Sequence, residues 1–181
     1  MTAAALESAL TTPPLRPLPG PAAELLRALD APARLGAHLR VVHDVAWSLT
    51  DVLGRRRPDL GFDTTAVLFG AATHDIGKVV HVAELAGPGS AHEAAGEELL
   101  LRYGVPAHLA RFANSHGSWT SPDATLDDLL VSLADQISRG SRVPALEHRV
   151  AEATGHLTDV LDALAADATS HSAFQLSYPL P

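Results

Sequence analysis

The chain has 181 residues, 46% of them hydrophobic, and a formal net charge of −8, which suits one compact domain and excludes two ordinary enzyme domains. It contains no cysteine, so disulfides, cysteine nucleophiles and thiolate metal sites are excluded. The acidic balance argues against binding to nucleic-acid polymers through their phosphates. Neither a membrane-spanning apolar run nor a secretory signal is recognisable, so we expect a cytoplasmic protein with no membrane partner.

The sequence predicts an all-α, single-domain helical bundle, because apolar residues recur three and four positions apart and strand signals are nearly absent. We expect this bundle over residues 22–168. Residues 1–21 are predicted to form an N-terminal tail, since the stretch TTPPLRPLPGP is too rich in proline for a helix. Residues 169–181 show no clear period and are predicted to form a C-terminal tail.

Start and stop signals divide the bundle into helices. In chain order, the expected helices cover residues 21–30, 33–57, 63–75, 91–103, 106–115, 125–137 and 143–166. Asp63 is the expected N-cap of the helix that follows it. Ser90 with Glu93 predicts a capping box, in which each residue satisfies a backbone N–H of the other. Thr125 with Asp128 predicts a second such cap.

Histidine is unusually abundant, with ten residues against two tryptophans, two tyrosines and four phenylalanines. On the predicted helices, six imidazole or carboxylate groups fall on or beside inward faces: His38, His74, Asp75, His92, His116 and Asp135. A buried polar group without a partner costs free energy, and one small core would have to supply partners for all six. A metal centre satisfies them together, because imidazole and carboxylate ligands suit Zn, Fe, Mn, Co or Ni. Two ions could share Asp75.

The order of these residues resembles the H…HD…H…H…D pattern of the HD-domain superfamily of metal-dependent phosphohydrolases. The motifs that carry the resemblance are HLRVVHDVA, ATHDIGK, SAHEAAG, NSHGSW and SLADQISRGSR. They span about residues 34–142, and the resemblance implies an all-α bundle. The segment ADQISRGSR is most similar to the YqeK-type subgroup, which implies hydrolysis of diadenosine tetraphosphate. The span from His38 to His74 is longer than expected for that subgroup.

The resemblance also implies a pair of divalent transition-metal ions. One ion would be held by His38, His74, Asp75 and Asp135, and the second by Asp75, His92 and His116. Asp75 and Lys78 are the expected catalytic residues, and Lys78 would also neutralise phosphate charge. Arg139 and Arg142 are candidate donors to a phosphate, and Trp119 is a candidate platform for a base. A solvated lysine, surface ion pairs and a packing tryptophan are the competing explanations for these residues.

Alternatives remain open for the first ligand and for the reaction. His43 lies in the same motif as His38, but we prefer His38 for its place on the apolar stripe. The other histidines are assigned no ligand role: His81, His108, His148, His156 and His171. We expect a small phosphorylated partner, with a nucleotide as the preferred class. A diiron oxygenase with the same ligands and a non-catalytic nucleotide-binding module are the alternative functions.

Overall fold

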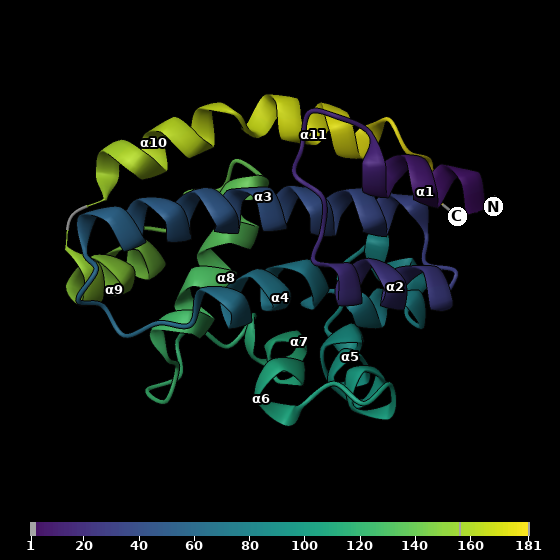
Figure 1. Cartoon of the computed structure of the whole chain (residues 1–181), viewed down its shortest axis with the longest axis horizontal. Helices are drawn as coiled ribbons and strands as arrows, with labels where there is room; N and C mark the ends of the chain where they lie inside the picture. The colour runs from purple at the N-terminus through teal and green to yellow at the C-terminus, as the bar shows by residue number, and fades with distance from the viewer. Residues whose placement is uncertain (1–2, 156, 181) are drawn as a thin grey trace.

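The computed structural model describes residues 3–155 and 157–180, and within these ranges it contains helices and their connections but no strand (Figure 1). The α-helices are α1 (Ala3–Thr11), α2 (Gly20–Ala28), α3 (Ala33–Arg56), α4 (Thr64–Thr73), α5 (Ala91–Arg102), α6 (Ala107–Ala110), α7 (Phe112–Ser115), α8 (Leu126–Ser138), α9 (Pro144–Thr154), α10 (Thr158–Ala166) and α11 (Ala168–Leu176). Two short 3₁₀ helices are η1 (Ile76–Val79) and η2 (Val82–Leu85). The predicted all-α fold is confirmed.

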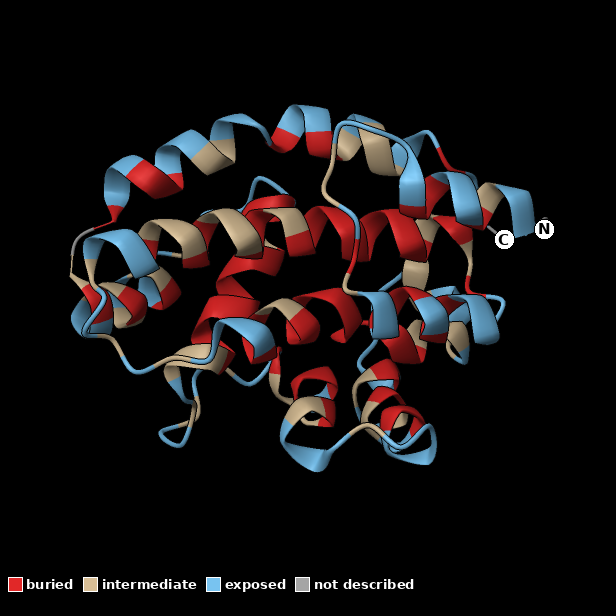
Figure 2. Ribbon diagram, viewed as in Figure 1, coloured by how far each residue is buried: buried red, intermediate tan, exposed pale blue. Residues whose placement is uncertain are grey.

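Helix α3 is the axis of the molecule. It is buried over most of its length, and α1, α4, α8 and α11 pack against it (Figure 2). Leu35 and Leu39 join a core formed with α1, α2 and α5, whereas Val42 and Val45 join a second core formed with α4, α8, α9 and α10. Residue 38 therefore lies on α3 where one apolar core gives way to the other.

Close packing of small residues lets other helices approach this junction. A Cβ atom on Gly70 of α4 would lie 2.6 Å from the ring of Phe112, so only glycine leaves room for the first residue of α7. A Cβ atom on Gly77 would lie 1.9 Å from the carbonyl oxygen of His92 and 2.6 Å from the nitrogen of Gly96, both backbone atoms of α5. The glycine of the HDIGK motif thus brings α5 into contact with η1.

Each of the two predicted tails contains a helix that the sequence did not predict. Residues Ala3–Thr11 form α1, whose Leu6 and Leu10 are buried against α3. The proline-rich stretch after α1 is held by Arg40, which donates hydrogen bonds to the carbonyl oxygens of Ala9, Leu15 and Arg16. The C-terminal stretch forms α11, which packs on α3 and α8. The sequence did not reveal α1 because this short helix directly precedes the proline-rich stretch. It did not reveal α11 because the apolar residues there show no clear helical period.

Other helix boundaries also differ from expectation. The helix expected over 143–166 is broken into α9 and α10, and Gly155 at the break has a φ of 87°, which favours glycine. The helix expected over 63–75 ends at Thr73. The Asp63 cap is confirmed by a 3.0 Å hydrogen bond from the Ala66 nitrogen, and the Thr125–Asp128 capping box is present.

The helices of residues 3–155 and 157–180 include none with the length and apolar character that a membrane span requires. His156, which was assigned no role, lies outside the described residues.

Candidate metal centre

Three helical segments bring the first group of side chains together. His38 comes from the second turn of α3, His74 caps the C-terminal end of α4, and Asp75 precedes η1. The Nε2 atoms of His38 and His74 are 3.4 Å apart, and they lie 3.2 and 3.6 Å from Oδ2 of Asp75. Asp135, from α8, places its Oδ1 3.4 Å from Nε2 of His38 and 3.5 Å from Nε2 of His74.

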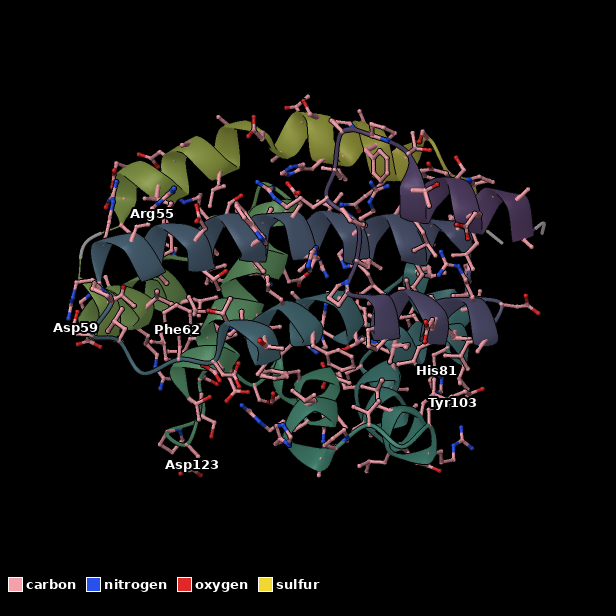
Figure 3. The ribbon with its side chains drawn as sticks, in the orientation of Figure 1. Arg55, Asp59, Phe62, His81, Tyr103 and Asp123 are labelled. Atoms are coloured by element: carbon pink, nitrogen blue, oxygen red, sulfur yellow. The ribbon has the colours of Figure 1, made fainter. Side chains whose placement is uncertain are left out.

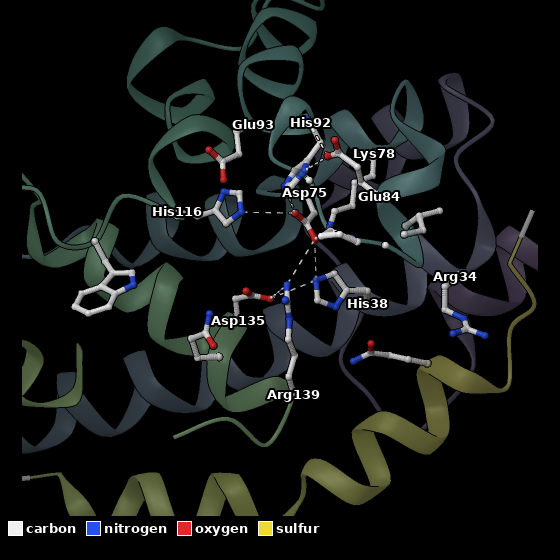
Figure 4. A pocket seen from close by; sticks show the side chains of 18 residues that line it. Arg34, His38, Asp75, Lys78, Glu84, His92, Glu93, His116, Asp135 and Arg139 are labelled. Atoms are coloured by element: carbon white, nitrogen blue, oxygen red, sulfur yellow. Dashed lines mark hydrogen bonds and ion pairs between the residues drawn. The ribbon is translucent and has the colours of Figure 1, made fainter. Parts of the chain in front are cut away.

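The other oxygen of Asp75 faces a second group. Its Oδ1 lies 2.9 Å from Nε2 of His92 on α5 and 3.6 Å from Nε2 of His116 at the end of α7. Figure 4 shows Asp75 between His38 and Asp135 on one side and His92 and His116 on the other. The six predicted ligands therefore converge, and Asp75 is the side chain common to both groups.

Hydrogen bonds on the outer side of the imidazoles fix which nitrogen faces the cluster. Nδ1 of His74 and Nδ1 of His116 lie 3.0 Å from the carbonyl oxygens of Ala71 and Ala113. A carbonyl oxygen can only accept, so each Nδ1 carries the proton and each Nε2 keeps its lone pair. Imidazoles that ligate metals in proteins are held in this way, with the second nitrogen donating to a fixed acceptor.

Glu84 plays the same part for His92, and the sequence did not reveal it. Its Oε2 accepts a 2.5 Å hydrogen bond from Nδ1 of His92, and the carboxylate also accepts from the backbone nitrogens of Ala91 and His92. These contacts cap α5, and the predicted cap is wrong because the Ser90 side chain makes no capping hydrogen bond. Glu84 lies eight positions before His92, which is no recognised capping or ligand spacing.

Charge is strongly polarised within the cluster. Burial alone would raise the pKa of Asp75 and of Asp135, but the surrounding imidazoles hold both pKa values well below the usual range. For His38, burial lowers the pKa, yet the nearby carboxylates of Asp135 and Asp75 outweigh this effect and raise the pKa. Burial, together with the charge of His74, lowers the pKa of His116 to about 4. The two carboxylates are therefore ionised, and a cation beside them would offset the cost of burying their charge.

Several ligand atoms are aimed at a shared point rather than at one another. Oδ1 of Asp75 and Nε2 of His92 are buried and make no hydrogen bond among the described residues, whereas the buried Oδ1 of Asp135 forms an ion pair with Arg139 at 2.8 Å. This holds although the first two lie only 2.9 Å apart. Buried polar atoms without hydrogen bonds are rare and costly, so this donor set requires a further partner. Imidazole nitrogens and carboxylate oxygens in this arrangement fit divalent metal ions.

The cluster opens into a cavity of about 510 Å³, a size that suits a small ligand. Lys78 places its Nζ 2.5 Å from Oδ2 of Asp75, because the 3₁₀ turn of η1 brings it over that carboxylate. Arg139 lies 2.8 Å from Oδ1 of Asp135 and also lines the cavity. Trp119 lines the cavity too, while its half-buried ring packs against the apolar core. Two cations and an aromatic ring thus surround the buried cluster.

Arg142, which was predicted to bind substrate, is not among the residues that line the cavity. Helix α8 ends at Ser138, and Gly140, with a φ of 72°, turns the chain away before a second helical turn can form. Arg142 instead forms ion pairs with Glu147, at 2.7 Å, and with Asp162. The expected two-turn spacing therefore never arises.

The histidines without an assigned role lie apart from the cluster. His43 is buried one and a half turns beyond His38, and burial lowers its pKa to about 4. His81 is half-buried and His108 is exposed. His148 is exposed on α9, 3.5 Å from Glu152, and His171 is buried on α11. Of the two candidates for the first position, the structure places His38 in the cluster.

Comparison with known families agrees with this geometry. The family model described as HD domain matches residues 36–140, more than half of the chain, and this range contains the whole cluster from His38 to Asp135. No curated protein and no solved structure matches the chain. With its cluster inside the matched range, the chain belongs to the HD domain family.

Proposed function

We propose that this protein is a metal-dependent phosphohydrolase that cleaves a small phosphate ester or anhydride, with nucleotides as its substrate class. The observation that carries the proposal is Asp75, whose two oxygens face two separate imidazole groups while Lys78 and Arg139 stand beside it. A buried anionic cluster with cations at its opening suits a substrate whose phosphate meets both metal ions and positive side chains. Membership of the HD domain family supports the same class of activity.

The residues would divide between two ions that share Asp75. The first site would use His38, His74, Asp75 and Asp135, and the second would use Asp75, His92 and His116. Divalent ions held in such paired sites activate water as a nucleophile and stabilise charge on a phosphoryl group. Zn, Fe, Mn, Co and Ni all accept these ligands, so the supply of metal decides the occupant.

The chain's own side chains would bind and orient the substrate. Lys78 is the only lysine of the sequence, and its ammonium group would exchange part of its contact with Asp75 for a phosphate oxygen. Arg139, with its side chain 45% exposed, is free to turn its second edge toward the same phosphate. The ring of Trp119 offers a face on which a base can stack. These contacts favour a nucleotide over a bare phosphate ester.

A narrower substrate follows from the sequence resemblance alone. The ADQISRGSR segment, which contains Asp135 and Arg139, is similar to that of YqeK-type proteins, so diadenosine tetraphosphate is the first nucleotide to test. We include it in the proposal as one member of the nucleotide class.

The test is a phosphate-release screen with metal-loaded protein. We expect hydrolysis of p-nitrophenyl phosphate and of at least one nucleotide, because the cluster, Lys78 and Arg139 face one cavity. Lys78→Ala should lower kcat/KM by about tenfold to a hundredfold, as expected for a lost charge-assisted contact to phosphate. The control is Arg55→Ala. Arg55 is exposed and, among the described residues, forms an ion pair with Asp51 only, so its loss should leave the rate of hydrolysis unchanged.

The proposal is contradicted if the protein, loaded with each metal in turn, hydrolyses none of the phosphate esters. Oxygen consumption by the iron-loaded protein in the same preparation would instead identify an oxygenase.

A further inference from the structure

The cavity extends from the cluster to a wall that the family match does not cover. Arg34, in the first turn of α3, and Gln175, on α11, line this wall, and both lie outside residues 36–140. Figure 4 shows Arg34 across the cavity from Glu93 and His116, beside the ribbon of the C-terminal helix. The wall is thus built from the two ends of the chain and is separate from the candidate metal ligands.

Arg34 differs from the other cations of the cavity because no carboxylate of residues 3–155 or 157–180 forms an ion pair with it. Lys78 and Arg139 are each held by Asp75 or Asp135. Arg34 is half-buried, and its one hydrogen bond among the described residues runs from Nε to the carbonyl oxygen of Tyr178, at 2.5 Å. A guanidinium group carries five N–H donors, so those on its terminal nitrogens remain for a ligand. A half-buried arginine that has no counter-charge in the described part of the chain favours an anion as its ligand.

Gln175 lines the same cavity as Arg34, and packing holds the end of the chain that carries it. The rings of Phe174 and Tyr178 meet edge to face with centroids 5.5 Å apart, and Tyr178 is buried against Ala9, Ala33 and Ala37 of α1 and α3. The same anchor fixes the carbonyl oxygen that holds Arg34. Gln175 follows Phe174, and its amide can donate to an anion. A donor held by packing loses less entropy when it binds.

The opposite wall disfavours an anion. Glu93 lines the cavity there, and no described residue forms a hydrogen bond or an ion pair with its carboxylate. An anionic group placed beside Glu93 would meet like charge, whereas one placed beside Arg34 would meet a cation. The cavity therefore has a polarity that orients a bound substrate.

We propose that Arg34 and Gln175 form a subsite for a second anionic group of the substrate, a phosphate or a carboxylate, on the side of the cavity away from Glu93. The inference rests on the proposed function, because it takes the first phosphate to sit at the cluster. It restricts the substrate class to compounds that carry a further oxyanion beyond the phosphate that reacts.

Non-hydrolysable phosphonates test the subsite without turnover. The probes are n-butylphosphonate and its derivatives with a terminal carboxylate or a terminal phosphonate, each measured as an inhibitor of p-nitrophenyl phosphate hydrolysis. For the native protein, we expect at least one terminal anion to tighten binding by about tenfold, the effect of one charge-assisted hydrogen bond. The derivative that binds more tightly than n-butylphosphonate shows whether the subsite binds a carboxylate or a phosphate.

Two variants and a control locate the effect. Arg34→Gln should abolish the tenfold gain while changing the inhibition constant of n-butylphosphonate less than about twofold. Gln175→Glu should do the same by charge repulsion, and it leaves the bond between Arg34 and Tyr178 in place. Arg55→Gln, at the far end of the same helix (Figure 3), should keep the gain.

The inference is overturned if the terminal anions give no gain in the native protein, or if both subsite variants retain it. If metal-loaded protein fails to hydrolyse p-nitrophenyl phosphate, the proposed function fails on its own. The same three affinities, measured by calorimetry, then still decide the subsite.

Discussion

At the scale of single residues, His38 and His43 show how burial alone fails to mark a ligand. Both are buried on α3, but the Nε2 of His38 lies 3.2 Å from Asp75, whereas Nδ1 of His43 is buried without a hydrogen bond among the described residues. Burial, opposed only by the charge of Asp44, lowers the pKa of His43 from 6.5 to about 4. His43 is therefore a neutral core residue at physiological pH.

This assignment predicts the effect of His43→Leu. Between pH 6.5 and about 4, the unfolded chain binds a proton at His43 that the folded chain does not, so the free energy of unfolding falls as the pH decreases through this window. Leucine removes that loss, and the variant should be more stable than the native protein by about 2 kcal/mol at pH 5. Urea denaturation at pH 7 and pH 5 measures the difference.

His38→Ala supplies the comparison. It should abolish metal binding at the first site, whereas His43→Leu should leave metal content unchanged. If His43→Leu loses the metal and His38→Ala retains it, then His43 is the ligand and His38 is not.

The sequence made the candidate ligands predictable at the residue scale, because each follows a recognisable motif. Glu84 could not be found in this way, since it reaches His92 through the turn of η2 rather than through a regular helix spacing. Arg142 does not reach the cavity lining because α8 ends at Ser138, before the second turn that the prediction assumed. The contacts that depend on irregular backbone were the ones that the motifs did not reveal.

At the scale of helices, the contact between η1 and α5 joins the two imidazole groups. Gly77 touches the backbone of His92 and Gly96, so no side chain fits between the segments. Gly77→Ala should separate η1 from α5 and move Asp75 away from His92. We expect it to lower the free energy of unfolding by about 3 kcal/mol or more, because backbone atoms cannot yield as a flexible side chain does.

Gly54→Ala is the matched control for this prediction. A Cβ atom on Gly54, near the end of α3, would meet nothing within 4 Å. Gly54→Ala should therefore raise the free energy of unfolding by about 0.5–1 kcal/mol. Thermal unfolding of both variants provides the measurement. A Gly77→Ala protein as stable as the native one would show that the close contact is not required.

At the scale of the whole molecule, the cluster lies where the two apolar cores meet along α3 and draws side chains from α3, α5, α8 and the ends of α4 and α7. The all-α class was predictable from apolar spacing, but the roles of α1 and α11 were not. Their burial depends on long-range contacts, such as Arg40 with Ala9 and Arg34 with Tyr178. Local periodicity carries no information about such contacts.

Because the ligands come from so many helices, metal binding should stabilise the entire fold. An ion present at a hundredfold excess over its dissociation constant adds about 2.7 kcal/mol to the free energy of unfolding. For a chain of this length, a chelator should then lower Tm by roughly 5–10 °C. Differential scanning calorimetry with and without chelator measures the shift. A Tm that is the same with and without chelator would show that metal binding does not stabilise the fold.

Anomalous diffraction from crystals grown with manganese or zinc tests the central claim most directly. We predict two peaks flanking Asp75, one bounded by His38, His74 and Asp135 and the other by His92 and His116. Peaks confined to surface groups, such as His148 with Glu152, or no peak beside Asp75 at saturating metal, would contradict it.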